Sequence, residues 1–377
     1  MRIALASRIF EPESGAAAYR LGAMVRELRA CGHDVTIFTS HAPGSPSSSR
    51  QVRRWPVLRD RSGAVRGYLQ YASFDMPLFF RLLLAPRYDI LIVEPPPTTG
   101  VVVRIVSWLK RYPYLYFAAD VSSVAAEGIG VNAAVVRVLR GVERWVLRGA
   151  RGVLSVSGGV SSEVRELAGR DTPIHEVGTG IDTELFTMEG PRADVGQKTF
   201  VYAGTMSEIQ GAGVFVEAFM KIHLNHPDAA LLMYGQGVEE EHLKAVAAGA
   251  GDRVQFGGNV AGETVAAALR TALAGLASVR PSRGYDFAFA TKALVSLSCG
   301  APVLYAGVGP LREVINENEL GWTVDWNSDE VAAAMEMILE EGFEDSRRAE
   351  LSAWASANYS LAAVGRSAAE AVSQYVG

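Results

Sequence analysis

The chain has 377 residues, a length typical of two domains, and its formal net charge at pH 7 is −5. Hydrophobic residues make up 49% and charged residues 20%, which is an ordinary composition for a globular protein. The acidic composition gives no electrostatic support for binding nucleic acid, and two distant cysteines, Cys31 and Cys299, exclude a disulfide framework and favour a reducing cytoplasm. The opening residues do not match a signal peptide, and no apolar run is long enough to cross a bilayer.

The first half of the chain alternates apolar segments of strand length with segments of helical period, which is typical of parallel α/β folds. A buried strand is expected at 2–7 and an amphipathic helix at 17–31, which Gly32 ends before a second strand at 34–39. This βαβ unit is half of a doubly wound sheet. Further strands are expected at 89–93, 114–117 and 153–156, with a helix at 132–148.

The second half repeats the same architecture without a visible sequence repeat. Its strands are expected at 199–204, 230–235, 254–258, 273–279 and 302–305. Glycines and polar residues interrupt the pattern near 177–186, which places a linker at about 180–197. The expected domains are therefore 1–180 and 197–360, each Rossmann-like, followed by an Ala-rich helix at 361–377.

Five motifs follow one another in an order and spacing that resemble the retaining GT-B glycosyltransferases of family 4. The most informative is 281–307, PSRGYDFAFATKALVSLSCGAPVLYAG, which is similar to the donor-sugar signature of that family. The other four are FEPESG at 10–15 with GHDV at 32–35, GIDTELF at 180–186, YAGTM at 202–206 with QG at 210–211, and GP at 309–310 with EVI at 313–315 and GWTV at 321–324. Within the family the nearest resemblance is to the WcaI-like and WbuB-like branch, which also opens with Phe-x-Pro-Glu and carries a lysine at the position of Lys292.

The resemblance implies two Rossmann-like domains facing a cleft, with the last helix crossing back to the N-terminal domain. It also implies transfer of a sugar from a nucleoside diphosphate to an acceptor with retention of configuration, by a hexosyltransferase that needs no cofactor. A UDP- or GDP-sugar is the expected donor, and a glycolipid or a small metabolite is the expected acceptor. No Asp-x-Asp motif or ligand cluster suggests a metal.

The donor phosphates are expected to meet loop amides and one lysine. Gly204 ends a strand before a helix, where backbone N–H groups can hold phosphate. Thr205 and Gln210 offer neutral donors in place of the usual Arg and Lys pair of the family, as they do in the nearest branch. Lys292 is then the cation expected at the phosphates, and a solvated helix lysine is the alternative.

Other donor contacts are carried over from the family motifs. The turn of Ala288, Phe289, Ala290 and Thr291 is expected to present backbone N–H groups to the sugar, unless it is a plain helix start. Gly258, Asn259 and Val260 match the loop that contacts the base, for which a simple β-turn is the alternative.

The two signature acids of the family are replaced in this chain. The first falls on Phe287, beside Asp286, which is expected either to contact the sugar or to cap a helix. The second falls on Val295, which cannot accept hydrogen bonds from ribose, so ribose binding is expected to be weaker or moved. A catalytically degenerate GT-B subunit that binds a nucleotide or a partner is therefore the alternative function.

Three features of the N-terminal half bear on the acceptor. The loop of Ser14, Gly15 and Ala16 is expected to approach the phosphates or the acceptor. Asp120 ends a strand and is the candidate acceptor-activating or acceptor-binding carboxylate, unless it caps a helix. The arginines of 50–66 and the apolar run 76–84 are expected to be a basic surface loop and a buried helix. Alternatively, they dock the N-terminal domain on the anionic inner face of a membrane or on a phosphorylated acceptor.

Overall fold

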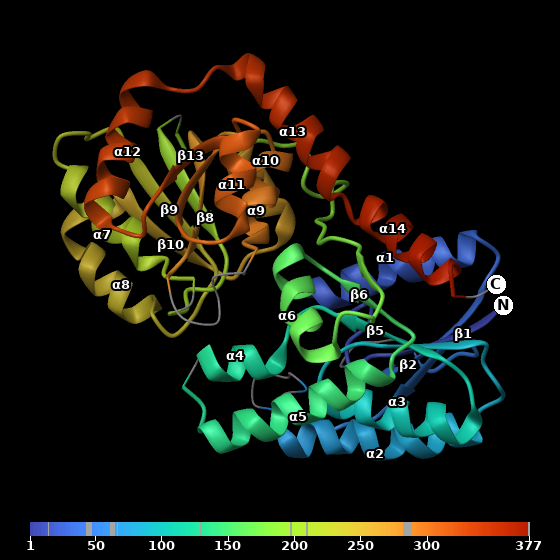
Figure 1. The fold of residues 1–377 in the computed structure, drawn as a ribbon. Coiled ribbons are helices and arrows are strands. Elements are labelled where there is room, and N and C mark those ends of the chain that lie inside the picture. The colour runs from blue at the N-terminus through green and yellow to red at the C-terminus, as the bar shows by residue number, and fades with distance from the viewer. Residues whose placement is uncertain are drawn as a thin grey trace. The chain divides into compact units, whose positions relative to one another are not determined.

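The computed structural model describes residues 1–13, 15–42, 47–60, 65, 67–128, 130–196, 198–208, 210–281 and 289–375. These residues form two compact units, each built around one parallel sheet (Figure 1). The first unit comprises Met1–Gly180 and Leu361–Gly377, and the second comprises Ile181–Ser360. The predicted fold class, two Rossmann-like doubly wound domains, is confirmed.

The first unit has a seven-stranded parallel sheet in the order β3-β2-β1-β4-β5-β6-β7. Ile3 lies in register with Val35 on one side and Ile90 on the other, so β1 is central and the strand order reverses between β1 and β4. The strands are β1 (Arg2–Ala6), β2 (Asp34–Ser40), β3 (Val52–Trp55), β4 (Ile90–Val93), β5 (Tyr114–Ala118), β6 (Gly152–Ser155) and β7 (Ile174–Glu176).

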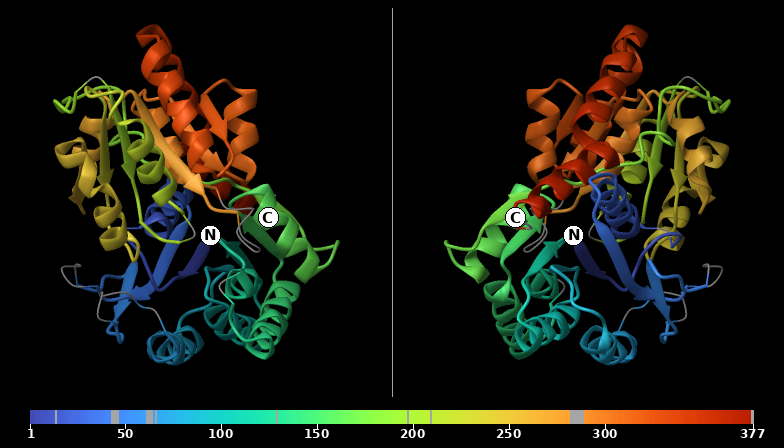
Figure 2. Two further views of the ribbon diagram at one scale, coloured as in Figure 1. Left: turned by 90° about the vertical axis from the view of Figure 1, so that its left-hand side faces the viewer. Right: turned by 90° about the vertical axis from the view of Figure 1, so that its right-hand side faces the viewer.

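Helices cover both faces of this sheet (Figures 1 and 2). On one face α1 (Ala16–Ala30) packs against α14 (Leu361–Ser373), and Leu21 and Val372 share a core with Ile3. The other face is covered by α2 (Tyr68–Leu84), α3 (Pro97–Lys110) and α5 (Ala133–Gly149). The remaining helices of the unit are α4 (Ser122–Gly128) and α6 (Gly158–Ala168).

The second unit has a six-stranded parallel sheet in the order β10-β9-β8-β11-β12-β13. The strand order reverses between β8 and β11, the position at which doubly wound sheets leave a ligand crevice. The strands are β8 (Thr199–Ala203), β9 (Ala230–Tyr234), β10 (Val254–Gly258), β11 (Ala274–Val279), β12 (Val303–Gly307) and β13 (Gly321–Val324).

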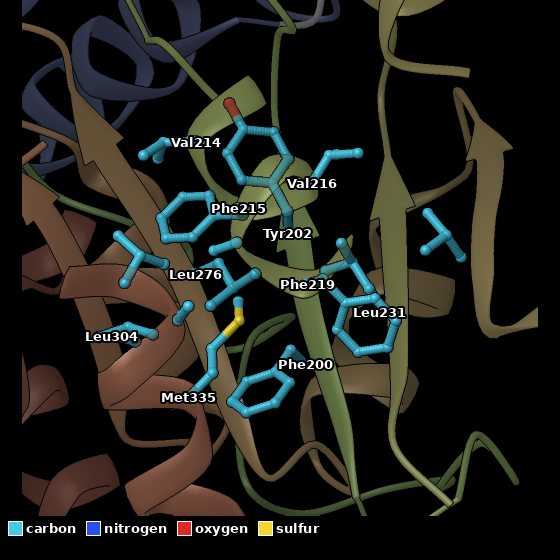
Figure 3. Close-up of a cluster of buried hydrophobic side chains, with 14 of the residues drawn as sticks. Phe200, Tyr202, Val214, Phe215, Val216, Phe219, Leu231, Leu276, Leu304 and Met335 are labelled. Carbon is cyan, nitrogen blue, oxygen red and sulfur yellow. The ribbon is translucent and has the colours of Figure 1, made fainter. Parts of the chain in front are cut away.

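Two helical layers bury the faces of this second sheet. Phe200, Phe215, Phe219 and Met335 meet in the core beneath α7 and α12 (Figure 3). The opposite face packs against α9, α10, α11 and α13. The helices are α7 (Gly213–Ile222), α8 (Glu240–Ala247), α9 (Gly262–Leu269), α10 (Thr291–Ser298), α11 (Pro310–Glu317), α12 (Ser328–Glu341) and α13 (Asp345–Tyr359), with a 3₁₀ turn at Ala248–Arg253.

Two segments differ from their sequence-based interpretation. The basic stretch after residue 50 contains β3, an edge strand that pairs with β2, where a loop was one of the expectations. The segment 181–196, expected as part of a linker, lies within the second unit, where Arg270 donates hydrogen bonds to the carbonyl oxygens of Thr187 and Pro191. No helix of the described residues has the length and apolarity needed to cross a bilayer.

Candidate functional site

A cavity of about 480 Å³ opens in the second unit where β8, β9 and β10 reach their carboxyl ends. Ligands of open parallel sheets bind at this edge. The lining combines backbone from glycine-rich turns with apolar side chains of valine, phenylalanine and tyrosine. Its residues are Phe186, Ala203, Gly204, Thr205, Tyr234, Gly235, Gln236, Asn259, Val260, Val265 and Val295. Gly204, Thr205, Asn259, Val260 and Val295 were among the residues predicted for donor binding.

Glycines bring the three strand ends close together. The Gly204 N–H donates to the Tyr234 carbonyl at 3.0 Å, and the Gly235 N–H donates to the Gly258 carbonyl at 2.8 Å. Gly235 has φ of +109°, and a Cβ at this residue would collide with the Gly204 carbonyl. Because only glycine combines this conformation with such a close approach, the turn depends on its residue type. The result is a shallow floor of backbone groups beneath the cavity.

Lys292 lies beside this floor. Its side chain runs over Gly204, so that a Cβ at Gly204 would come within 2.6 Å of Lys292 Cε. The Lys292 Nζ donates a hydrogen bond to Gln210 Oε1 and lies 5.5 Å from the centroid of the Tyr202 ring. Lys292, Gln210 and Gly204, predicted separately as donor-binding residues, are therefore brought together.

The electrostatic setting of Lys292 favours an anionic ligand. Within the part of the chain that the structure describes, Lys292 Nζ has no carboxylate partner, and Gln210 supplies a neutral oxygen. Burial lowers the pKa of Lys292 to about 8, because the ammonium loses solvation. A buried cation that has no carboxylate partner among the described residues, and that lies beside a cavity, is a candidate phosphate-binding group.

Val295 lies one turn after Lys292 on α10 and places an apolar side chain on the cavity wall. It is joined there by Val260 and Val265. None of the described lining residues is a carboxylate, so this part of the wall has no strong acceptor for sugar hydroxyls.

The turn before α10 is only partly described. Ala290 is buried at the N-terminal end of α10, and Thr291 is the first helical residue. The centroid of the half-buried Phe289 ring lies 5.5 Å from that of Tyr359, at the edge of the hydrophobic core, and Phe289 does not line the cavity. The predicted contacts of Asp286, Phe287 and Ala288, like that of Ser14, lie outside the described residues.

A second polar cluster lies in the first unit, where its strand order reverses. Ser7 follows β1, and Glu94 follows the neighbouring β4. The Ser7 hydroxyl donates to Glu94 Oε2 at 2.8 Å, and Arg20 of α1 pairs with Glu94 Oε1 at 3.3 Å. Burial raises the pKa of Glu94, and Arg20 opposes that shift. The sequence analysis did not predict this cluster. The sequence feature that could have indicated it is a glutamate directly after a buried strand.

Asp120 follows β5, the next strand along the sheet, and its side chain is exposed. Partial loss of solvation nevertheless raises the pKa of Asp120, while Arg20 and Arg8 oppose the shift. The alternative prediction for Asp120 was that it caps a helix. Glu143 fills that role at the start of α4, because it accepts hydrogen bonds from the Ser122 and Ser123 N–H groups at 2.7 and 3.0 Å. Asp120 therefore has an exposed carboxylate of raised pKa just after the carboxyl end of β5.

The loop before α1 ends at Gly15, which has φ of +148° and has open space where a Cβ would be. Ala16 is the first residue of α1. The strained backbone favours glycine at this position, whereas no described contact assigns either residue to a ligand. Among the described residues there is no group of three or more His, Cys, Asp or Glu side chains that would hold a metal ion.

The two sheets, each with its order reversed once, and the glycine-lined cavity define a GT-B protein. Comparison with protein families agrees: residues 15–180 match a glycosyl transferase 4-like domain, and residues 197–341 match the glycosyl transferases group 1. The chain belongs to the family 4 glycosyltransferases of the GT-B fold.

Individual relatives are distant. The glycogen synthase of Mycobacterium tuberculosis is 25% identical over 264 residues, which cover 66% of this chain and 62% of that protein. Among solved structures, the sucrose-phosphate synthase of Thermosynechococcus elongatus has a TM-score of 0.72 at 19% identity, covering 100% of this chain and 95% of its own. Anabaena HepE, solved with UDP and glucose, has a TM-score of 0.71 at 18% identity, covering 99% of both chains. At these identities the structural likeness establishes the fold alone.

Proposed function

We propose that this protein transfers a sugar from a nucleoside-diphosphate sugar to an acceptor hydroxyl, with retention of configuration. The observation that carries the proposal is the position of Lys292, a cation without a carboxylate partner among the described residues, over the glycine floor of the cavity. A diphosphate there would meet the ammonium group of Lys292, which suits a leaving group that carries two negative charges in the donor and gains a third as it departs.

The donor is proposed to be a UDP- or GDP-sugar. HepE, whose fold is similar, was solved with UDP and with UDP-glucose, which supports the first of these. The proposal includes no cofactor, and the positive potential that the departing diphosphate needs is proposed to come from Lys292.

The acceptor is proposed to be a lipid-linked glycan or a small metabolite, bound in the first unit. In transfer, the bond from the anomeric carbon to the phosphate oxygen breaks, and the acceptor oxygen forms a bond to that carbon. The acceptor proton must pass to a base, and Asp120 is the candidate. Its raised pKa brings it closer to the working pH, which strengthens a carboxylate as a base. A cytoplasmic site, peripheral to the inner face of a membrane, would suit a lipid-linked acceptor.

A second candidate function is a catalytically inactive nucleotide-binding subunit. The observation that favours it is the apolar wall at Val295, where the described lining has no carboxylate for ribose. In that case the cavity would bind a nucleotide without supporting transfer.

Calorimetry with UDP, GDP and dTDP separates these functions. We expect one nucleotide to bind to the unmodified protein and to bind much more weakly to Lys292→Ala. Asp120→Asn should bind that nucleotide normally but lose sugar transfer, and it is the matched control because its carboxylate lies in the other unit. Absence of binding by all three nucleotides would overturn both functions, whereas binding without donor turnover would favour the inactive subunit.

A further inference from the structure

The helix α2 presents an apolar surface to solvent. Every exposed side chain of this fully described helix is aromatic or aliphatic: Tyr68, Leu69, Ala72, Met76, Phe80 and Leu84. Leu69, Met76, Phe80 and Leu84 recur at helical spacing and form one stripe, with 73%, 64%, 55% and 83% of each residue exposed. A surface helix normally turns charged residues outward, so this stripe marks an interaction surface.

The neighbouring helix α3 extends the apolar surface. Trp108 and Leu109 are exposed near its C-terminal end. Lys110 Nζ donates to the carbonyl oxygens of Leu83 and Ala85 at 2.9 and 2.6 Å, which fastens the end of α3 to the end of α2. The exposed Leu84 and Trp108 therefore lie near the joined ends of the two helices.

The third helix of this layer, α5, adds positive charge. Arg137, Arg144 and Arg148 are exposed, and their spacing places them along one side of the helix. Across α2, α3 and α5, all of whose residues are described, the basic side chains are Arg81, Arg104, Lys110, Arg137, Arg140, Arg144 and Arg148. The carboxylates of the same three helices are Asp75 and Glu143, and both are buried. This layer is thus cationic although the whole chain has a net charge of −5.

Aromatic residues also lie among the charges. Arg104 stacks over the Trp145 ring at 4.1 Å, and Trp145 is 43% exposed. Tryptophan and arginine are suited to the boundary between lipid headgroups and acyl chains, because each combines a broad apolar body with a polar end.

We propose that the exposed faces of α2, α3 and α5, here called the α2–α3–α5 layer, dock this protein on an anionic phospholipid membrane. The apolar stripe of α2 inserts at the headgroup boundary, and the α5 arginines pair with lipid phosphates. A second copy of the chain fits this layer less well, since a two-fold interface would bring the same arginine row against itself. The inference does not depend on the identity of the sugar donor.

Vesicle flotation with the full-length protein tests this docking. We expect the protein to float with vesicles that contain phosphatidylglycerol and to remain unbound with phosphatidylcholine alone or in high salt. The triple variant Met76→Ser, Phe80→Ser, Leu84→Ser should lower the vesicle-bound fraction, and so should Arg137→Glu, Arg144→Glu, Arg148→Glu, each by about tenfold or more in partition coefficient.

Matched variants control for general surface changes. Leu224→Ser with Val238→Ser removes apolar side chains that are 77% and 83% exposed in the second unit, and Arg366→Glu reverses a charge on α14. These should float normally, and every variant should keep the thermal melting temperature of the unmodified protein. The proposal is overturned if the protein does not bind anionic vesicles, if the controls lose binding as much as the layer variants, or if light scattering shows a dimer that Phe80→Ser separates without any effect on vesicles.

Discussion

The end of the Lys292 side chain lies against Gly204. A Cβ added at Gly204 would meet Lys292 Cε at 2.6 Å and Nζ at 3.5 Å, and the next nearest atom is the Tyr202 hydroxyl at 3.6 Å. The lysine can occupy this position because residue 204 has no side chain. The ammonium is thereby held at the end of β8, beside Gly204 in the lining of the cavity.

Gly204→Ala should therefore weaken nucleotide binding while leaving the fold intact, because the atom that must move is near the flexible end of a lysine. If the displaced Lys292 loses its contact with phosphate, the affinity for the diphosphate should fall about 10- to 100-fold, the value of one hydrogen bond to a charged group. Calorimetry measures this. Gly141→Ala on α5 is the control, since no heavy atom lies within 4 Å of its added Cβ; equal affinities for both variants would contradict the Lys292–Gly204 relationship.

Nucleotide affinity should depend on pH through Lys292. The pKa of this lysine in the free protein is about 8, so its ammonium is charged at lower pH and is lost as pH rises through that value. Affinity for UDP or another nucleoside diphosphate that binds should therefore decline between about pH 7 and pH 9. Lys292→Arg keeps its charge over the whole range and should give a flat profile. A decline of the same size in Lys292→Arg would assign the titration to another group.

Val295→Glu should restore discrimination between ribose and deoxyribose. The unmodified cavity wall offers valine side chains here, so UDP and its 2′-deoxy analogue should bind with similar affinity. A carboxylate at residue 295 would accept a hydrogen bond from the ribose hydroxyl and should favour UDP by about 1.5–3 kcal/mol. Val295→Leu changes size without adding an acceptor and should leave the two affinities similar. If Val295→Glu also fails to discriminate, ribose lies elsewhere in the cavity.

Arg20→Ala should destabilise the first unit by about 3–5 kcal/mol at neutral pH, because it removes the ion-pair partner of the buried Glu94 carboxylate. Without Arg20 the pKa of Glu94 should rise further above its ordinary value of 4.5. An acid of raised pKa destabilises the folded state increasingly as pH rises above the unfolded value, so the deficit should shrink near pH 4.5. Denaturant unfolding at two pH values measures this, and Arg20→Met combined with Glu94→Gln should recover much of the loss.

The fold could be predicted from the sequence because its central strands are short, fully apolar runs such as ILIV at 90–93. The strand β3 was not predicted because it lacks such an apolar run. Val52–Trp55 contains two arginines and lies at the sheet edge, where an apolar pattern is not required. Residue spacing predicted that Lys292 and Gly204 act together; Lys292 Cε does lie against Gly204, which lines the cavity, and their role in donor binding stays a prediction.

Other parts of the site could not be predicted. Glu94 and Arg20 are 74 residues apart, and they meet because β1 and β4 are neighbours, which no local pattern reveals. The Phe289 ring packs beside Tyr359 at the edge of the core, and the donor contact predicted for the backbone of this turn stays a prediction. A resemblance between motifs gives the path of the backbone, whereas the direction of a replaced side chain depends on its new neighbours.

The helix α14 gives the chain a fixed order of assembly. Ala368 and Val372 belong to the same core as Ile3 and Leu21, yet the ribosome makes them after all of Ile181–Ser360. During synthesis the second unit has its complete sequence available first, while one face of the N-terminal sheet is covered by α1 but still lacks α14. Loss of the last helix would accordingly expose the oldest part of the nascent chain to aggregation and proteolysis, although the deletion is at the opposite terminus.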